Sequence, residues 1–295
     1  MVDELTVLVC SLAREPIPGA QRVAWLRELA PGVRVIGLNE ELPSEPHDHP
    51  QFWETWTAAI TRALGSTPDA VFTSEDYGDE LARRIGSRHV LIDRARSVVR
   101  VSGTAIRRDP MAHWQYIPAS VRPWFVRRVV VTGSESTGKT TLAARLADEL
   151  GTVVSPEFAR DYLDRKAAPL DQHDVEVIAI GQLDQEARYA RRAARVLILD
   201  TDLFSTVVYG VHYYGSIEPW IERVARERQA HLYLLLDVDV PWVADPQRDR
   251  GDRRDEMHAL FRGALDRSGA RYVTIAGSWE ERLQRAQAAV RAELG

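Results

Sequence analysis

Residues 133–140 constrain the fold of this chain more than any other segment. They read G-S-E-S-T-G-K-T and match the full phosphate-binding pattern G-x-x-x-x-G-K-[ST], the P-loop or Walker A motif. An apolar run at 129–131 precedes the motif, and Leu142, Leu146 and Leu150 follow it at helical spacing. A strand, a glycine loop and a helix in this order surround a phosphate with backbone N–H groups and the positive end of a helix dipole. The segment therefore predicts a nucleoside triphosphate site; a chance match is the alternative.

Two side chains of the motif have expected contacts with the triphosphate and its metal ion. Lys139 is expected to reach the β and γ phosphates, and the Thr140 hydroxyl is expected to bind Mg²⁺. The other positions supply backbone N–H groups. The predicted ATP-binding set is Gly133, Ser134, Glu135, Ser136, Thr137, Gly138, Lys139, Thr140 and Thr141.

Chain length and patterning indicate two domains. A chain of 295 residues exceeds the usual size of one domain, and we expect residues 1–126 and 127–295 to form separate domains. In both parts, strand-like apolar runs alternate with segments of helical spacing, which predicts an α/β protein with two doubly wound parallel sheets. In the first part the expected strands are residues 5–10, 33–38, 70–73 and 90–92.

Composition and charge exclude several classes of function. Hydrophobic residues make up 45% of the chain, and the formal net charge of −5 gives no nucleic-acid footprint. Cys10 is the single cysteine, so neither an intramolecular disulfide nor a cysteine metal cluster can form. The sequence contains no signal peptide and no long apolar run. We therefore expect a cytoplasmic protein that binds neither nucleic acid nor a membrane, and homo-oligomers are compatible with the sequence.

Glu157 follows the expected strand at residues 152–154. Ligands of open α/β sheets lie at the carboxyl ends of the strands, so this carboxylate is a candidate general base for an acceptor hydroxyl. Arg160 and Asp161 lie one helical turn further on and are candidate substrate contacts. The alternative for Glu157 is a carboxylate that only favours a helix N-terminus.

A second strand end carries two acids. The apolar run 196–199 ends in Asp200-Thr201-Asp202, which resembles a Walker B strand that delivers a carboxylate to Mg²⁺. Asp200 is the expected partner of the metal ion, bound directly or through a water molecule. It is also a candidate substrate contact. Asp202 is expected further into the site, where it would bind the acceptor sugar or share the catalytic role with Glu157.

Aromatic side chains gather in the segment that follows these acids. Tyr209 and Trp220 are candidate stacking partners for a ring of the acceptor, including a cationic ring. Core packing is the alternative for each of them.

Four arginines follow the strand expected at residues 231–236. Arg248, Arg250, Arg253 and Arg254 lie in a charged segment of the kind that forms a kinase lid, in which guanidinium groups close over a transferring phosphoryl group. Arg248 is the candidate catalytic arginine, and the other three are candidate ATP contacts. A solvated charged turn is the alternative, and the interspersed acids argue against nucleic-acid binding.

The second half of the chain resembles the ribosylnicotinamide kinase domain of NadR-type proteins. The resemblance rests on G-S-E-S-T-G-K-T-T at 133–141, E-F-A-R at 157–160, L-D-T-D at 199–202, and D-V-P-W at 239–242 through R-D at 248–249. It implies ATP- and Mg²⁺-dependent phosphorylation of the nicotinamide riboside 5′-hydroxyl to nicotinamide mononucleotide, a step of NAD salvage. Nicotinamide riboside and ATP are the implied small-molecule partners.

The first half resembles a nicotinamide-mononucleotide adenylyltransferase, a Rossmann-like nucleotidyltransferase. Ser102, Thr104 and Arg107 match the S-x-T-x-x-R triphosphate motif of that family. The family opens with a strand and an H-x-G-H-type motif, and this sequence begins roughly where the second strand of the family starts. We therefore expect an adenylyltransferase-like domain without its first strand and H-x-G-H motif, and no adenylyl transfer. The helix-turn-helix module of the family is also missing, so no DNA-binding role is expected.

Three other functions stay open at this point. The same P-loop core would serve another nucleoside or nucleotide kinase, because the acceptor pocket decides the substrate. An ATP-binding regulator without catalysis is the alternative from another class, although it needs neither Glu157 nor an arginine lid. A bifunctional enzyme that also adenylylates nicotinamide mononucleotide is the third, if the true start lies upstream.

Overall fold

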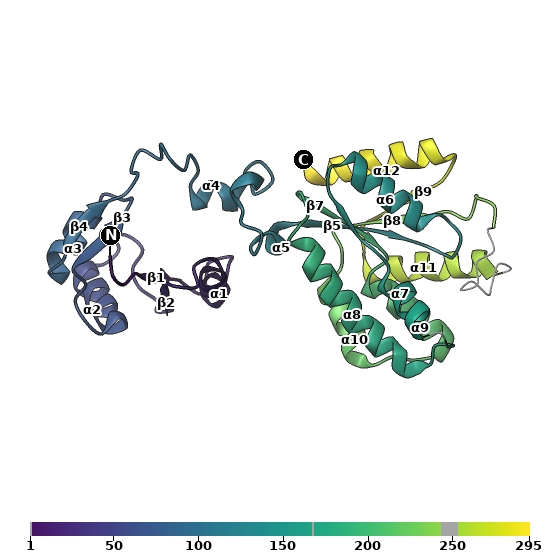
Figure 1. The fold of residues 1–295 in the computed structure, drawn as a ribbon, viewed down its shortest axis with the longest axis horizontal. Helices are drawn as coiled ribbons and strands as arrows, with labels where there is room; N and C mark the ends of the chain where they lie inside the picture. Colours follow the sequence, from purple (N-terminus) through teal and green to yellow (C-terminus); the bar gives the residue numbers. More distant parts are fainter. Residues whose placement is uncertain (1, 167, 243–252) are drawn as a thin grey trace. The chain divides into compact units, whose positions relative to one another are not determined.

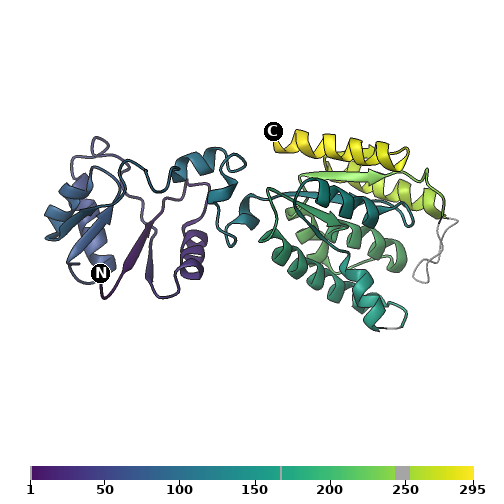
Figure 2. The same ribbon diagram turned by 45° about the horizontal axis from the view of Figure 1, so that its top comes forward.

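The computed structural model describes residues 2–166, 168–242 and 253–295, which form two compact units (Figures 1 and 2). The first unit is Met1–Arg108 and the second is Asp109–Gly295. The sequence placed the boundary after residue 126 instead. The segment before that point belongs to the second unit because it carries apolar side chains that are buried there: Trp114, Ile117 and Val126.

The second unit is built on one parallel sheet. Its five strands have the order β6-β7-β5-β8-β9, so the P-loop strand β5 lies at the centre. Strands β7 and β8 are buried at every position, because helices cover both faces of the sheet. The strands are β5 Arg127–Thr132, β6 Val153–Ser155, β7 Val196–Asp200, β8 Leu232–Leu236 and β9 Tyr272–Ile275.

Helices α6 and α12 cover one face of this sheet, and α7 to α11 lie on the other side (Figure 1). Valines of β5 pack against Leu142 and Leu146 of α6 and Leu283 and Val290 of α12, which forms the main core. The helices are α6 Lys139–Glu149, α7 Phe158–Lys166, α8 Gln172–Ala190, α9 Leu203–Tyr214, α10 Pro219–Glu227, α11 Arg254–Ser268 and α12 Trp279–Leu294; the short elements η1 Trp114–Tyr116 and α5 Arg122–Phe125 precede β5.

The first unit contains two separate two-stranded sheets. In one, β1 (Thr6–Cys10) pairs in parallel with β2 (Arg34–Leu38), and in the other β3 (Ala70–Thr73) pairs in parallel with β4 (Arg88–Leu91). Within the described residues no ladder joins β1 to β3, so the single sheet expected from the sequence is divided here. The helices of this unit are α1 Gly19–Leu29, α2 Phe52–Leu64, α3 Gly78–Ile85 and α4 Gly103–Arg108.

Parallel strands and strand–helix alternation in both units confirm the predicted α/β class. Among the helices of residues 2–166, 168–242 and 253–295, none combines the length and the apolar character that a bilayer span requires.

Candidate active site

The P-loop leaves the carboxyl end of β5 and requires glycine at two positions. Gly133 has a φ of +135°, and a Cβ there would lie 2.9 Å from the Leu236 carbonyl oxygen. Gly138 has a φ of +88°, and its Cβ would lie 2.2 Å from the Trp279 ring. Both positive φ values lie in the region that L side chains rarely adopt. Gly138 is followed at once by α6, so the loop ends at a helix N-terminus, as the sequence predicts.

Hydrogen bonds inside the loop hold its shape. The Ser134 carbonyl oxygen accepts from the Thr137 hydroxyl at 2.8 Å and from Lys139 Nζ at 2.9 Å. Ser134 and Thr137 are buried, whereas Thr140 and Thr141 at the start of α6 are exposed. The lysine therefore folds back onto the loop, and the first turn of the helix is accessible at Thr140 and Thr141.

Asp200 at the end of β7 lies beside the Thr140 hydroxyl, which hydrogen-bonds to its carboxylate. Asp200 is 2% exposed, and its Oδ1 has no hydrogen-bond partner within the described part of the chain. Burial raises the pKa of Asp200, while the Thr140 hydrogen bond, Lys139 and Arg160 act in the opposite direction. A hydroxyl and a carboxylate with one unused oxygen are hard oxygen ligands of the kind that Mg²⁺ takes. These two residues therefore fit the predicted metal site.

Glu157 lies between β6 and α7, at the same end of the sheet. Its carboxylate is 3.7 Å from an Arg160 guanidinium nitrogen. The next residue, Phe158, donates its backbone N–H to the buried Gln182 side chain at 3.1 Å, so α8 fixes this turn. Sequence spacing predicted that Glu157 faces the P-loop end of the sheet, and the structure places it there.

The Tyr209 side chain of α9 joins this group. Burial raises the pKa of Tyr209 well above its ordinary value, and the nearby carboxylates of Glu157, Glu135 and Asp200 raise it further. Its ring stacks on Tyr213 with centroids 6.2 Å apart. The structure thus brings Tyr209, Glu157 and Asp200 together, as the sequence predicts.

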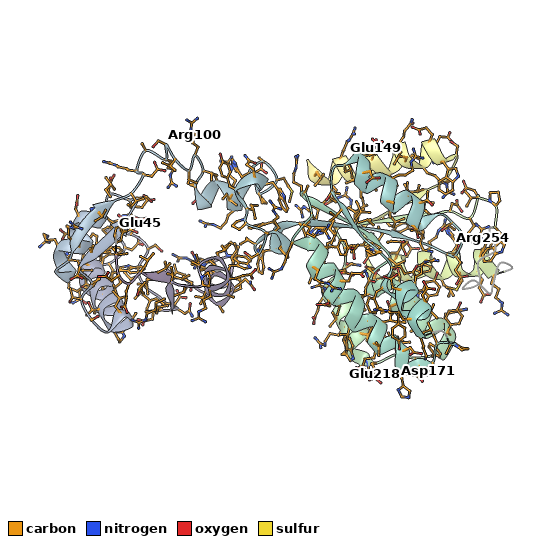
Figure 3. The ribbon with its side chains drawn as sticks, viewed as in Figure 1. Glu45, Arg100, Glu149, Asp171, Glu218 and Arg254 are labelled. Atoms are coloured by element: carbon orange, nitrogen blue, oxygen red, sulfur yellow. The ribbon has the colours of Figure 1, made fainter. Side chains whose placement is uncertain are left out.

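The arginines expected in the lid have different positions. Arg248 and Arg250 lie outside the described residues. Arg253, the residue before α11, pairs with Glu256 of that helix, with 3.8 Å between the charged atoms. Arg254, labelled at the start of α11 in Figure 3, donates to the Ser136 carbonyl oxygen at 3.3 Å and to the Val240 carbonyl oxygen at 2.9 Å. Arg254 therefore contacts the P-loop backbone itself.

Comparison with protein families gives a match over this whole site: residues 128–282 match the family described as AAA domain. The chain belongs to the AAA domain family. Its AAA domain holds the P-loop, Glu157, Asp200 and the whole of α11.

Two curated relatives extend the similarity beyond the AAA domain. The "Trifunctional NAD biosynthesis/regulator protein NadR" of Escherichia coli (strain K12) is 32% identical over 270 residues, which cover 86% of this chain and 64% of that protein. The protein of the same name from Salmonella typhimurium (strain LT2) is 32% identical over 250 residues, covering 80% of this chain and 60% of that protein. The chain thus spans less than two thirds of the length of these relatives.

Two solved structures are similar over nearly the whole chain. A crystal structure of NadR protein in complex with NR has a TM-score of 0.83, with 25% identity, and covers 99% of this chain and 89% of that one. A crystal structure of NadR protein in complex with NAD and AMP-PNP has a TM-score of 0.80, also with 25% identity, and covers 99% of this chain and 88% of that one. The resemblance to NadR-type proteins predicted from the motifs is confirmed.

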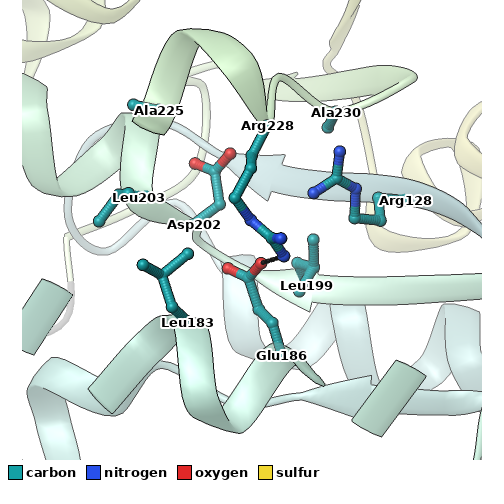
Figure 4. Close-up of a pocket in the computed structure, with 9 residues that line it drawn as sticks. All are labelled: Arg128, Leu183, Glu186, Leu199, Asp202, Leu203, Ala225, Arg228 and Ala230. Atoms are coloured by element: carbon teal, nitrogen blue, oxygen red, sulfur yellow. Dashed lines mark ion pairs between the residues drawn. The ribbon is translucent and has the colours of Figure 1, made fainter. Parts of the chain in front are cut away.

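Asp202 of the AAA domain has a different environment from the one expected. It caps α9 by accepting from the Ser205 backbone N–H at 3.1 Å, and its other oxygen accepts from the Tyr233 hydroxyl at 3.0 Å. It lines a small polar cavity with Arg128 and the ion pair of Glu186 and Arg228, shown in Figure 4. Because both oxygens accept hydrogen bonds inside the protein, the geometry favours a structural role for Asp202, and the predicted acceptor-binding or catalytic role stays a prediction.

Trp220 and Asp161 also lie apart from the group formed by the P-loop, Asp200 and Glu157. Trp220 Nε1 donates to Glu176 at 3.0 Å, and the ring packs in the apolar cluster formed by α8, α9 and α10. Asp161 is exposed on the first turn of α7. The core-packing alternative therefore describes Trp220, and no contact joins Asp161 to the P-loop in the described residues.

Arg282 of α12 is a site residue that sequence reasoning missed. Its side chain is 0% exposed, and its guanidinium donates to the Thr137 carbonyl oxygen of the P-loop at 3.1 Å. The sequence carried a signal for it: Arg282 lies four and eight residues before the buried Ala286 and Val290, on the apolar stripe of the helix. An arginine in such a stripe must be hydrogen-bonded inside the protein.

Proposed function

We propose that this chain is an ATP-dependent ribosylnicotinamide kinase. It would transfer the γ-phosphoryl group of ATP to the 5′-hydroxyl of nicotinamide riboside and so form nicotinamide mononucleotide for NAD salvage. The observation that carries the proposal is the grouping of the P-loop, the Thr140–Asp200 pair and Glu157 at one end of a buried sheet. The similarity to NadR structures with NR and with AMP-PNP bound supports it.

The residues of the site have complementary roles in this proposal. The P-loop N–H groups and Lys139 bind and orient the phosphates, and Thr140 and Asp200 hold Mg²⁺. The bound ion supplies positive charge where the phosphate oxygens develop negative charge. Glu157 orients or deprotonates the acceptor hydroxyl, since it lies at the same end of the sheet as the P-loop. Phosphoryl transfer depends mainly on such positioning and charge stabilisation.

Tyr209 and Arg160 would form the acceptor side of the site. The Tyr209 ring is half-buried among carboxylates, an environment that suits a cationic ring such as nicotinamide riboside carries. The excess of negative charge from Glu135, Glu157 and Asp200 favours the same ligand. Arg160, close to Glu157, would set the position of that carboxylate. Arg248, Arg250 and Arg253 remain proposed lid residues.

For the first unit we propose an adenylyltransferase-like fold. Ser102 of its S-x-T-x-x-R segment accepts from the Ala105 backbone N–H at 3.0 Å, as a helix cap does, and Arg107 donates to Thr104 at 3.2 Å. These contacts hold the segment together. The cytoplasmic location expected from the sequence stays a prediction.

The test is phosphate transfer from ATP and Mg²⁺ to nicotinamide riboside, with adenosine, cytidine and thymidine as parallel acceptors. We expect nicotinamide mononucleotide as the main product, with loss of transfer when Mg²⁺ is chelated. Lys139→Ala should abolish the reaction. Arg145→Ala, on the exposed side of the same helix, is the matched control and should not change it.

Each other outcome points to one of the alternatives. Preference for another nucleoside would contradict the substrate assignment and retain the kinase. ATP binding without transfer to any acceptor would contradict the enzyme and favour an ATP-binding regulator. Formation of NAD from nicotinamide mononucleotide and ATP would show that the protein is bifunctional.

A further inference from the structure

A phosphate-binding loop needs hydrogen-bond donors for its own carbonyl oxygens, in addition to the N–H groups that it offers to the phosphate. When consecutive N–H groups turn toward an anion, the carbonyl groups of the same residues turn away and must find donors inside the protein. Here the Ser134 carbonyl oxygen accepts from Thr137 and Lys139 of the loop itself. The Ser136 and Thr137 carbonyl oxygens accept from outside the loop, each from an arginine.

The arginine that serves Thr137 is Arg282, whose side chain is completely buried. Besides Nη1, which donates to the Thr137 carbonyl oxygen at 3.1 Å, its Nε donates to the Gly277 carbonyl oxygen at 2.9 Å. Its Nη2 donates to the Asp237 carbonyl oxygen at 3.2 Å and forms an ion pair with the Asp239 carboxylate. One guanidinium thus joins the P-loop, the segment after β8 and the turn between β9 and α12.

Two neighbours make this junction rigid. Asp239 also accepts from the Gly277 backbone N–H at 2.6 Å, so the segment after β8 is tied to the turn by a second bond. The Arg282 guanidinium lies 5.9 Å from the centre of the Trp279 ring, and this ring covers the α-carbon of Gly138. The P-loop is therefore held both by its Thr137 carbonyl group and across its last glycine.

We infer that Arg282 is a positioning residue of the nucleotide site. It holds the carbonyl face of the P-loop toward the protein, so that the N–H groups keep the orientation that phosphate binding needs. It does not contact the phosphate, because Nε, Nη1 and Nη2 all donate to protein oxygens. The Asp239 carboxylate balances the buried positive charge of Arg282, so the two side chains position the P-loop together. The inference rests on the ATP site of the proposed function and not on the identity of the acceptor.

The experiment measures ATP·Mg²⁺ binding to the full chain by titration calorimetry, together with KM and kcat where transfer is observed. We expect Arg282→Met to raise the Kd for ATP about tenfold or more, as the loss of one charge-assisted hydrogen bond does. Arg282→Lys keeps the charge and one or two donors, and should recover part of that loss. Arg285→Met, an exposed arginine on the same helix, should leave the Kd within about twofold of the wild-type value.

Asp239→Asn keeps Arg282 in place. It therefore tests the same inference when an Arg282 variant does not fold. It removes the charge that orients the guanidinium, and we expect the Kd for ATP to rise about three- to fivefold, less than for Arg282→Met. The KM for the acceptor should change less than the KM for ATP in every variant. A merely structural role would lower the melting temperature without this split between the two KM values.

The inference would be overturned by a folded Arg282→Met protein that binds ATP like the wild type. If neither Arg282 variant folds, wild-type affinity in Asp239→Asn overturns it in the same way. Because ATP binding is read without an acceptor, failure of the proposed kinase reaction has a different signature: the wild type then binds ATP and transfers no phosphate to nicotinamide riboside.

Discussion

The two units of this chain use parallel strands in different ways. In the second unit, β7 and β8 are buried at every position, and they flank a P-loop strand that is itself central. In the first unit each sheet has two strands, and apolar side chains such as Phe72, 41% exposed, and Leu91, 48% exposed, face outward. A five-stranded sheet covered by helices on both faces excludes water from its strands, whereas a two-stranded sheet excludes much less.

This difference agrees with the proposed location of the chemistry in the second unit. A catalytic group must be held firmly by its surroundings, and strand ends of a buried sheet provide that. The P-loop, Asp200 and Glu157 all lie at the carboxyl ends of strands of the five-stranded sheet and meet at one end of it. In the first unit, the hydroxyl of Ser102 caps its own short helix instead.

Lys139→Ala should have the largest effect of all the variants. It tests whether the activity belongs to the second unit. We expect phosphate transfer to fall by about 100- to 1,000-fold or more, because the lysine is the positive side chain of the phosphate loop. The melting temperature should change little, since the hydrogen bond from the lysine to the Ser134 carbonyl oxygen lies within the loop itself. Arg83→Ala in the first unit removes an exposed cation and should leave the rate unchanged. Equal losses in both variants would contradict the placement of the site in the second unit.

The second comparison concerns two leucines in parallel strands. Leu234 of β8 is 0% exposed and Leu91 of β4 is 48% exposed. Leu234→Ala should lower the free energy of unfolding by about 2–5 kcal/mol, because it leaves a cavity in a packed core. Leu91→Ala should lower it by less than about 1 kcal/mol. Urea denaturation of the full chain measures both, and a large loss for Leu91→Ala would show that β4 is covered in solution.

The sequence was most informative where several local signals agreed. At the P-loop, the glycine spacing, the apolar strand and the helical leucines all predicted one conformation, and the structure has it. Asp200 and Glu157 followed from the rule that ligands lie at the carboxyl ends of parallel strands. These predictions depend only on local pattern and strand direction.

The remaining site residues depend on contacts that local pattern does not contain. Asp200 and Asp202 are two residues apart, yet one lies beside Thr140 and the other caps α9 and binds Tyr233 from another strand. Arg282 contacts a loop that lies 145 residues earlier in the chain. Such partners are set by the folded sheet and cannot be deduced from spacing.

Glu157→Gln and Asp202→Asn test this distinction within the second unit. Glu157→Gln should lower kcat by about 100-fold and hardly change stability, since the amide fills the same space without accepting the proton. Asp202→Asn should instead lower the free energy of unfolding by about 1–3 kcal/mol, because the buried oxygens serve Ser205 and Tyr233. Steady-state kinetics and urea midpoints of both variants provide the measurement. A kcat loss in Asp202→Asn as large as that in Glu157→Gln would restore the catalytic role predicted for Asp202.

The smallest expected effect is a dependence of stability on pH that arises from Glu186 and His231 of the second unit. Burial raises the pKa of Glu186 from 4.5 to about 7, with Asp202 adding to the shift and Arg228 opposing it. Its contribution to stability is therefore present below pH 4.5 and lost as the pH rises through about 7. Burial and the nearby arginines lower the pKa of His231 from 6.5 to about 4, so its contribution is present above pH 6.5 and lost as the pH falls toward 4.

Between pH 4.5 and 6.5 these two contributions have opposite slopes and offset each other. Glu186→Gln should leave a stability that rises with pH in this window, and His231→Gln one that falls, each by at most about 1.4 kcal/mol per pH unit for a single proton. Glu80→Gln is the control from the first unit. Arg83 and Arg84 hold the pKa of Glu80 down to about 2, so its contribution is lost only below the window and the slope there should stay as in the wild type. The measurement is the urea midpoint of the wild type and the three variants across this pH window. Identical slopes of stability against pH in all four proteins would mean that Glu186 and His231 are as solvated as the Glu80 carboxylate of the first unit.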